Sequence, residues 1–181
     1  MSNGPKFAER INAASFPEHV SEELMQLEAV AFISRLRKQS GLTSYSPCRN
    51  ILLVDFPHAD ARTFAEIYAD ICREYADLSE FCVIRLGDIV KEDPIKTFTS
   101  AREVFEGIYD KVVFIEDMTE FFTEHKGTDE EMYMLNAILM PYRYDPNHIA
   151  FVVPTSSELL EGYGRFMEAA ERLHPEKVNF N

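Results

Sequence analysis

Short apolar runs alternate with longer amphipathic stretches along most of the chain, and this alternation predicts the fold. Runs of four to six residues rich in branched side chains, typical of buried strands, occur at 51–54, 81–86, 112–115 and 149–153. Between them, apolar residues recur at helical spacing at 64–75, at about 100–108 and from about 129 to 139. Buried strands joined by helices indicate a mostly parallel sheet covered on both faces, which is an α/β fold.

The pattern is weaker at the start of the chain. Two prolines interrupt residues 1–20, so we expect a loosely ordered lead-in there and one α/β core domain over 21–181. A helix with apolar residues at helical spacing is predicted from Ser21 to about Gln39, ended by Gly41. Beyond the last apolar run, the pattern predicts a helix over about 157–173 and a short strand at 177–180.

Composition narrows the classes of function. The 181 residues are 46% hydrophobic, which favours a globular domain with a substantial core. A formal charge of −13 opposes binding to nucleic acid and to anionic membranes, both of which bind clustered Lys and Arg. Three unpaired cysteines favour a reducing, cytoplasmic setting, and no cysteine–histidine spacing suggests a metal site. We therefore expect a cytoplasmic protein without a metal, nucleic acid or membrane partner.

The stretch after the first apolar run has the layout of a phosphate-binding loop without its chemistry. A strand at 51–54 is followed by residues 55–63 and then by a helix, the order in which backbone N–H groups cradle an anion. Such a loop needs glycines to wrap the phosphates and a lysine for charge, and residues 55–63 contain neither. Asp55 and Asp60 instead add negative charge. We therefore expect no bound cofactor.

Six stretches carry a further signal: Leu36–Leu42, Thr63–Ala65, Leu86–Val90, Arg102–Val104, Val112–Asp117 and Glu161–Phe166. In this order and spacing they resemble the ATPase core of AAA+ proteins, and most of all the CbxX/CfxQ group that includes the red-type Rubisco activases. The resemblance covers about residues 22–181. It implies a three-layer P-loop NTPase core that assembles into rings.

The departures from the family pattern fall at its working parts. Ala61 takes the place of the phosphate-binding lysine, and Arg62 that of its Ser/Thr partner. The Asp-Glu pair of the Walker B strand is reversed, as Glu116–Asp117, and Asp93 stands where the family has a peptide-gripping aromatic residue. The chain ends after the expected last strand, so we expect the core to lack the family's helical lid.

These losses predict a catalytically inactive AAA+-like domain that acts as a protein-binding, scaffold or regulatory subunit, with no catalytic residues. The resemblance implies a protein partner, such as an active AAA+ paralogue, and we expect a monomer or weak oligomer alone. The alternative is a weak nucleotide-binding ATPase that holds ATP and Mg²⁺ in a remodelled site, formed by Arg62, Thr63, Glu116, Asp117 and Thr155. A plain protein-binding module that has kept the fold and lost the ring is a third interpretation.

Each candidate site residue also has a structural interpretation. Glu116 and Asp117 suit a metal site, but we favour a solvated acidic pair that caps nearby N–H groups. Arg62 suits phosphate, but we favour an ion pair with a cleft carboxylate such as Glu116. The interface candidates are Phe121 and Phe122, adjacent aromatics in a charged segment, and the arginines Arg165 and Arg172, which would face a neighbouring subunit.

Overall fold

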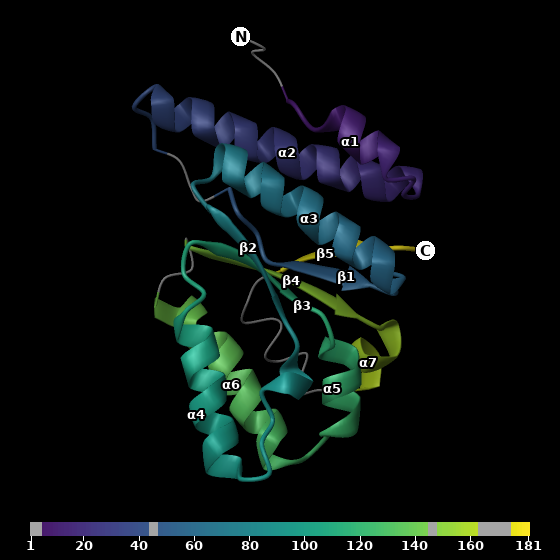
Figure 1. Ribbon diagram of the computed structural model, residues 1–181. Helices are drawn as coiled ribbons and strands as arrows, with labels where there is room; N and C mark the ends of the chain where they lie inside the picture. The colour runs from purple at the N-terminus through teal and green to yellow at the C-terminus, as the bar shows by residue number, and fades with distance from the viewer. Residues whose placement is uncertain (1–4, 44–46, 145–147, 163–174) are drawn as a thin grey trace.

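Five parallel strands form the centre of the molecule (Figure 1). A computed structural model describes residues 5–43, 47–144, 148–162 and 175–181. The sheet has the order β2-β3-β4-β1-β5, and every neighbouring pair is parallel. The predicted α/β class and parallel sheet are therefore confirmed. The strands are β1 (Ile51–Val54), β2 (Glu80–Ile84), β3 (Lys111–Ile115), β4 (Ile149–Thr155) and β5 (Glu176–Asn179).

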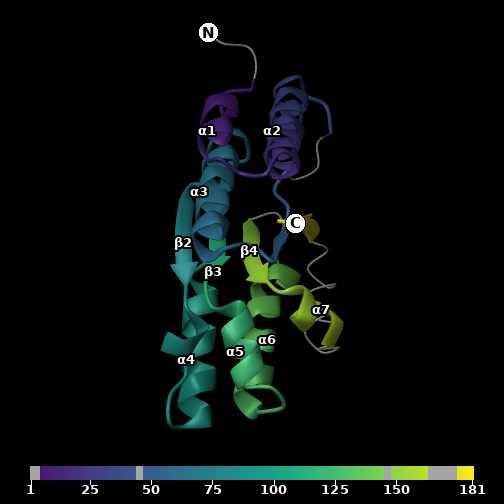
Figure 2. The same cartoon turned by 90° about the vertical axis from the view of Figure 1, so that its right-hand side faces the viewer.

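Helices cover both faces of the sheet, as the apolar strands require (Figures 1 and 2). One face carries α1 (Ala8–Ala13), α2 (Glu18–Gln39) and α3 (His58–Tyr75). The other carries α4 (Pro94–Glu106), α5 (Met118–Glu124), α6 (Asp129–Tyr144) and α7 (Ser157–Gly162). A 3₁₀ turn, η1 (Leu86–Asp88), follows β2.

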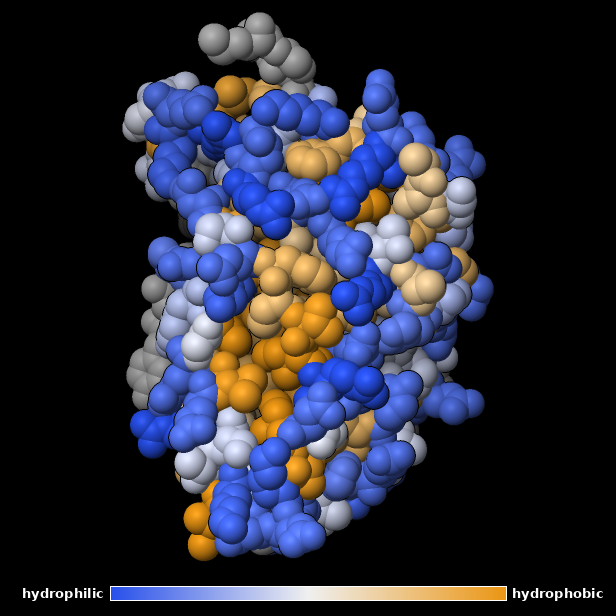
Figure 3. All heavy atoms as spheres, in the orientation of Figure 1, coloured by the Kyte–Doolittle hydropathy of each residue, from blue (hydrophilic) through white to orange (hydrophobic). Residues whose placement is uncertain are grey.

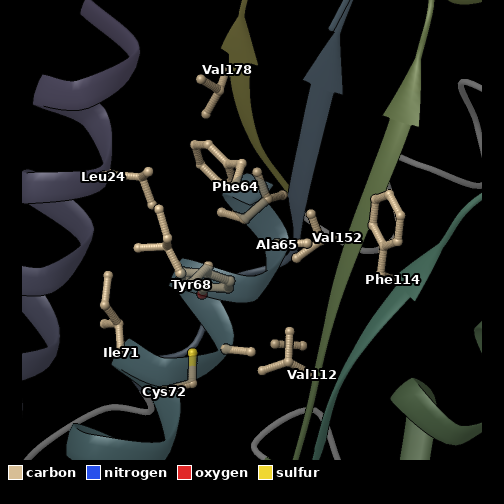
Figure 4. Packing of buried hydrophobic residues seen from close by; sticks show 14 of the residues in the cluster. Leu24, Phe64, Ala65, Tyr68, Ile71, Cys72, Val112, Phe114, Val152 and Val178 are labelled. Atoms are coloured by element: carbon tan, nitrogen blue, oxygen red, sulfur yellow. The ribbon is translucent and has the colours of Figure 1, made fainter. Parts of the chain in front are cut away.

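The alternation of side chains along each strand divides the core in two. On β4, Val152 belongs to the core shared with α3, whereas Val153 belongs to the core shared with α4, α5 and α6. Figure 4 shows Phe64, Ala65 and Tyr68 of α3 between Leu24 of α2 and Val152. Because β1, β3 and β4 are buried on both sides, their sequences are almost continuously apolar rather than alternating.

The sheet order places a topological switch point at the carboxyl ends of β1 and β4. From β1 the chain crosses one face through α3 to the far edge strand β2, whereas from β4 it enters α7 on the other face. Neighbouring strands whose connections leave to opposite faces open a crevice at their carboxyl ends, where α/β proteins bind ligands. Sequence analysis singled out Asp55 and Glu116, the first residues beyond β1 and β3, and Thr155, the last residue of β4.

The start of the chain differs from the expected loose lead-in. Residues 8–13 form α1, whose Ile11 is fully buried, and Phe16 packs on Phe64 of α3 with ring centroids 6.2 Å apart. The buried carboxylate of Glu28 accepts hydrogen bonds from the backbone N–H groups of residues 6 and 7. The lead-in is therefore held on the core by both apolar and polar contacts.

Three helices differ from the prediction. Helix α4 begins at Pro94 rather than near residue 100, because the Asp93 carboxylate accepts a hydrogen bond from the Ile95 N–H at 2.9 Å and caps it. Helix α5 was not predicted, and α6 continues through Pro141, where a turn was expected. The predicted helix over 157–173 is seen as α7 up to Gly162, and residues 163–174 lie outside the described part. None of the described helices combines the length and apolar character needed to cross a membrane.

Candidate functional site

The connection between β1 and α3 is much shorter than predicted. Only residues 55–57 separate β1 from α3, so the expected loop over 55–63 is wrong. The N–H of Ala61 donates to the carbonyl of Pro57 at 2.9 Å, and the Thr63 hydroxyl donates to the carbonyl of Ala59 at 2.9 Å. Without glycines this segment continues the helix, and the Ala61 side chain is fully buried. The N–H and hydroxyl groups of Ala61 and Thr63 therefore serve α3 instead of wrapping an anion.

Asp55 fastens the end of β1 to the start of α7. Its backbone has a φ of 58°, a left-handed conformation that aspartate tolerates better than most residues. Its N–H donates to the Thr155 carbonyl at 2.9 Å, and its carboxylate accepts from the Ser157 N–H at 2.9 Å. The carboxylate of Asp55 therefore has a structural partner at the switch point of the sheet.

Glu116, directly after β3, lies near two arginines and a histidine. Its carboxylate is 3.3 Å from Nε2 of His58, 3.4 Å from Nη1 of Arg62 and 3.5 Å from Nε of Arg85. The Glu116 side chain is only 13% exposed, whereas its three neighbours are about half exposed or more. The ion pair between Arg62 and Glu116 favoured from the sequence is therefore present. Glu116 supplies the anion that the two arginines would otherwise attract.

Asp117 uses both carboxylate oxygens to hold the turn after β2. One oxygen accepts from the Leu86 N–H at 2.6 Å and the other from the Gly87 N–H at 2.9 Å. A Cβ at Gly87 would lie 3.3 Å from the second oxygen, so a larger residue would crowd the contact. This geometry matches the capping interpretation of Asp117.

A cleft of about 560 Å³ opens beside these residues. Its lining carries four carboxylates against one arginine and two histidines: His58, Arg85, Gly87, Glu116, Asp117, Glu120, Phe121, Glu124 and His125. The rings of Phe121 and His125 stack with centroids 4.5 Å apart. No group of three or more acidic, cysteine or histidine side chains in the described ranges is arranged to hold a metal ion. A polyphosphate entering this cleft would meet more negative than positive charge.

Thr155, at the carboxyl end of β4, has an unengaged polar atom. Its side chain is 5% exposed, and among the described residues its hydroxyl oxygen has no hydrogen-bond partner. The neighbouring Ser156 hydroxyl accepts from the Leu159 N–H at 3.1 Å, so it caps α7. Of the five residues proposed for a remodelled nucleotide site, Thr63 and Asp117 already have intramolecular partners, whereas the Thr155 hydroxyl has none.

The aromatic interface candidates were wrong. Phe121 and Phe122 are 2% and 0% exposed and both belong to the core beneath α4 and α6. Their rings contact each other edge to face with centroids 5.2 Å apart. Because the segment is helix α5, packed between the sheet and the turn η1, both rings can turn inward. Arg165 and Arg172 lie outside the described residues, so their role stays a prediction.

Arg85 is a site residue that sequence analysis missed. It follows β2 directly, and β2 pairs with β3 in parallel, so their carboxyl ends lie side by side. The predicted strand over 81–86 enclosed Arg85, whereas β2 ends at Ile84, so a search for charged residues after each predicted strand would have passed over it. The signal in the sequence is a charged residue inside an otherwise apolar run.

The sequence matches no protein-family model, and no curated protein matches it. The functional interpretation of the cleft therefore rests on the contacts of its own residues. Those contacts are mostly internal: hydrogen bonds hold Asp55 and Asp117, and Arg62, Arg85 and His58 surround Glu116.

Proposed function

We propose that this chain is a catalytically inactive AAA+-like domain that acts as a protein-binding, scaffold or regulatory subunit. The observation that carries the proposal is the start of α3 at His58, where a nucleotide-binding protein of this layout needs an open loop. The backbone N–H of Ala61 is bonded within the helix, and the side chain at that position is a buried methyl group.

The charges of the cleft support the same proposal. A charge-assisted contact to phosphate contributes about 1.5–3 kcal/mol, so losing the lysine alone lowers affinity by about tenfold to a hundredfold. Arg62 does not replace it freely, because it also contacts Glu116 and Glu66. The carboxylates that line the cleft add repulsion toward ATP.

A domain without nucleotide chemistry acts through what it binds. An active AAA+ paralogue is the partner that the family resemblance suggests, and another protein partner is equally consistent with the fold. We expect the flank that carries Arg165 and Arg172 to face a neighbour's acidic cleft. Opposite charges across such an interface guide association and are screened by salt. The net charge of −13 favours a less acidic partner over stacked identical copies.

The buried hydroxyl of Thr155 favours the alternative, a weak nucleotide-binding ATPase, because an unpartnered polar atom at this edge could serve a ligand. ATP and Mg²⁺ would then require Arg62, Glu116 and Asp117 to leave their present partners. That rearrangement, and the hydrogen bond of the Thr63 hydroxyl within α3, make this alternative the weaker one. A plain protein-binding module differs from our proposal only in not binding an AAA+ protein.

Isothermal titration with ATP–Mg²⁺ separates these functions. Our proposal predicts no binding up to about 1 mM nucleotide, the weak end of specific affinities. The matched variants are Thr155→Val, which removes the unpartnered hydroxyl, and Glu116→Gln. Micromolar binding that Thr155→Val removes, with turnover abolished by Glu116→Gln, would establish the ATPase instead. Binding to an AAA+ paralogue that salt or Arg165→Glu with Arg172→Glu weakens would support the scaffold over the plain module.

A further inference from the structure

Helix α2 carries hydrophobic side chains on the side that faces away from the sheet. Val30, Ile33 and Leu36 are 48%, 55% and 45% exposed. The opposite side of the same helix packs on the core through other residues: Val20, Leu24 and Ala31. The outward side of α2 is therefore apolar at its centre, a feature typical of interaction surfaces when such residues are contiguous.

Charges on the same side of α2 are segregated by sign. A periodicity of 3.6 residues places Glu22, Gln26, Val30, Ile33 and Arg37 along one side of the helix. Glu22 and its exposed neighbour Glu23 have no ion-pair partner in the described part of the chain. The Arg37 guanidinium donates to the carbonyl of Thr43, at 3.2 and 3.3 Å, and contacts no carboxylate there. The helix is thus acidic before its apolar centre and basic after it.

We propose that this surface is a self-association site at which two copies of the chain pair their α2 helices antiparallel about a twofold axis. With Val30 at the axis, Arg37 of each copy lies opposite Glu22 and Glu23 of the other. Ile33 then packs beside Gln26 of the other copy. A twofold contact uses the same surface on both chains, so a single helix must be complementary to itself when reversed. The acidic–apolar–basic order of α2 meets this requirement.

The same pattern excludes the parallel arrangement, which would set Glu22 against Glu22 and Arg37 against Arg37. Elsewhere the net charge of −13 opposes contact between copies, so the favourable charges are confined to α2. A helix of 22 residues is about 33 Å long and about 10 Å wide, so the contact covers about 330 Å² on each copy, well below the roughly 800 Å² per partner of a standard interface. A weak, concentration-dependent dimer is therefore expected, whether or not the cleft binds nucleotide.

Sedimentation velocity across a concentration series of the full chain tests this site. Glu22→Lys with Glu23→Lys, and separately Arg37→Glu, should each weaken the dimer by at least about tenfold, because each sets like charges opposite one another. An equimolar mixture of the two variants should associate again as a heterodimer, since their altered charges complement each other. Ile33→Glu should abolish association while the thermal melt remains close to that of the native chain, because the side chain is exposed.

Two control variants test whether association depends on α2 itself, rather than on the net charge of the chain or on another apolar patch. Glu92→Lys with Glu103→Lys changes the net charge by the same amount at exposed positions outside α2, and should leave dimerisation unchanged or strengthen it. Val83→Glu alters the exposed edge strand β2, where Figure 3 shows a central hydrophobic band, and should have no effect. The proposal is overturned by a monomer at about 1 mM. It is equally overturned if the Glu22/Glu23 change strengthens association, or if Val83→Glu abolishes it and Ile33→Glu does not.

Discussion

Replacing Asp117 by alanine should destabilise the fold far more than replacing Glu116 by alanine. The two carboxylates are adjacent in sequence, but they make different kinds of contact. Asp117 accepts hydrogen bonds at 2.6 and 2.9 Å from two backbone N–H groups, one of them on the fully buried Leu86. Glu116 instead faces two arginines and a histidine that are about half exposed or more and 3.3–3.5 Å away.

The size of the difference follows from these contacts. A hydrogen bond to a charged group contributes about 1.5–3 kcal/mol, and the Leu86 N–H would lose its partner in a partly buried position. Water can replace the bond to the exposed Gly87 N–H, so we assign it less than about 1 kcal/mol. Asp117→Ala should therefore lower the free energy of unfolding by about 2–4 kcal/mol. Exposed ion pairs contribute about 0–1 kcal/mol each, which puts Glu116→Ala near 1 kcal/mol.

Urea and thermal unfolding of the native chain and both variants measure this difference. For a chain of this length, 1 kcal/mol corresponds to about 2–4 °C, so Asp117→Ala should lower Tm by about 5–15 °C. In 1 M NaCl the small effect of Glu116→Ala should shrink, because salt screens exposed pairs, whereas that of Asp117→Ala should persist. The loss of stability for Asp117→Asn should lie between zero and that for Asp117→Ala, since the amide oxygen of asparagine can still accept one hydrogen bond. Equal losses for Asp117→Ala and Glu116→Ala would refute the assignment of Asp117 as a structural cap.

Three other changes test separate parts of the structure. Phe122→Ala should lower the free energy of unfolding in urea by about 3–5 kcal/mol, because the ring is fully buried. An unchanged stability would contradict this burial. Thr63→Val should leave stability and nucleotide titrations within error, because the hydroxyl serves only the Ala59 carbonyl in α3. Burial and the neighbouring Glu28 carboxylate raise the pKa of Tyr75 to about 12 from its ordinary value of 10. Between these pH values the unfolded chain loses this proton and the folded chain keeps it, so stability falls as pH rises. Tyr75→Phe should flatten that decline, and an unchanged slope would contradict the contact.

The hydrophobic pattern was sufficient to locate the buried strands of the sheet, but it did not predict the connections between strands and helices. Buried parallel strands such as 112–115 have sequences that little else produces, so β1, β3 and β4 were located within two residues. The start of α3 was missed because the prediction took the layout of a phosphate-binding loop as its guide, although Ala59 and Ala61 favour helix. Helix α5 was missed because its seven residues make only about two turns, too few for the helical periodicity to be recognised.

The chemistry of the cleft was only partly predictable, since ion pairs depend on distances that the sequence does not contain. The pairing of Arg62 with Glu116 could be anticipated because strand ends converge in a parallel sheet. The inward turn of both Phe121 and Phe122 could not, because it depends on where α5 sits above the sheet. The sequence did not reveal that one side of α2 is exposed, for a different reason. Its apolar residues continue the spacing of the buried ones, and only tertiary contacts tell the two sides apart.

The early start of α3 also bears on how such a domain can evolve. Ala61→Lys would place a lysine where the AAA+ pattern has its phosphate-binding lysine, but it would bury the ammonium group at a position with no solvent exposure. Glycines at His58 or Asp60 would weaken the first turn of α3 without lengthening the connection. Building a phosphate-binding loop at this position therefore requires inserted residues together with several substitutions. No single substitution at the start of α3 supplies the length, the glycines and the exposed lysine that such a loop needs.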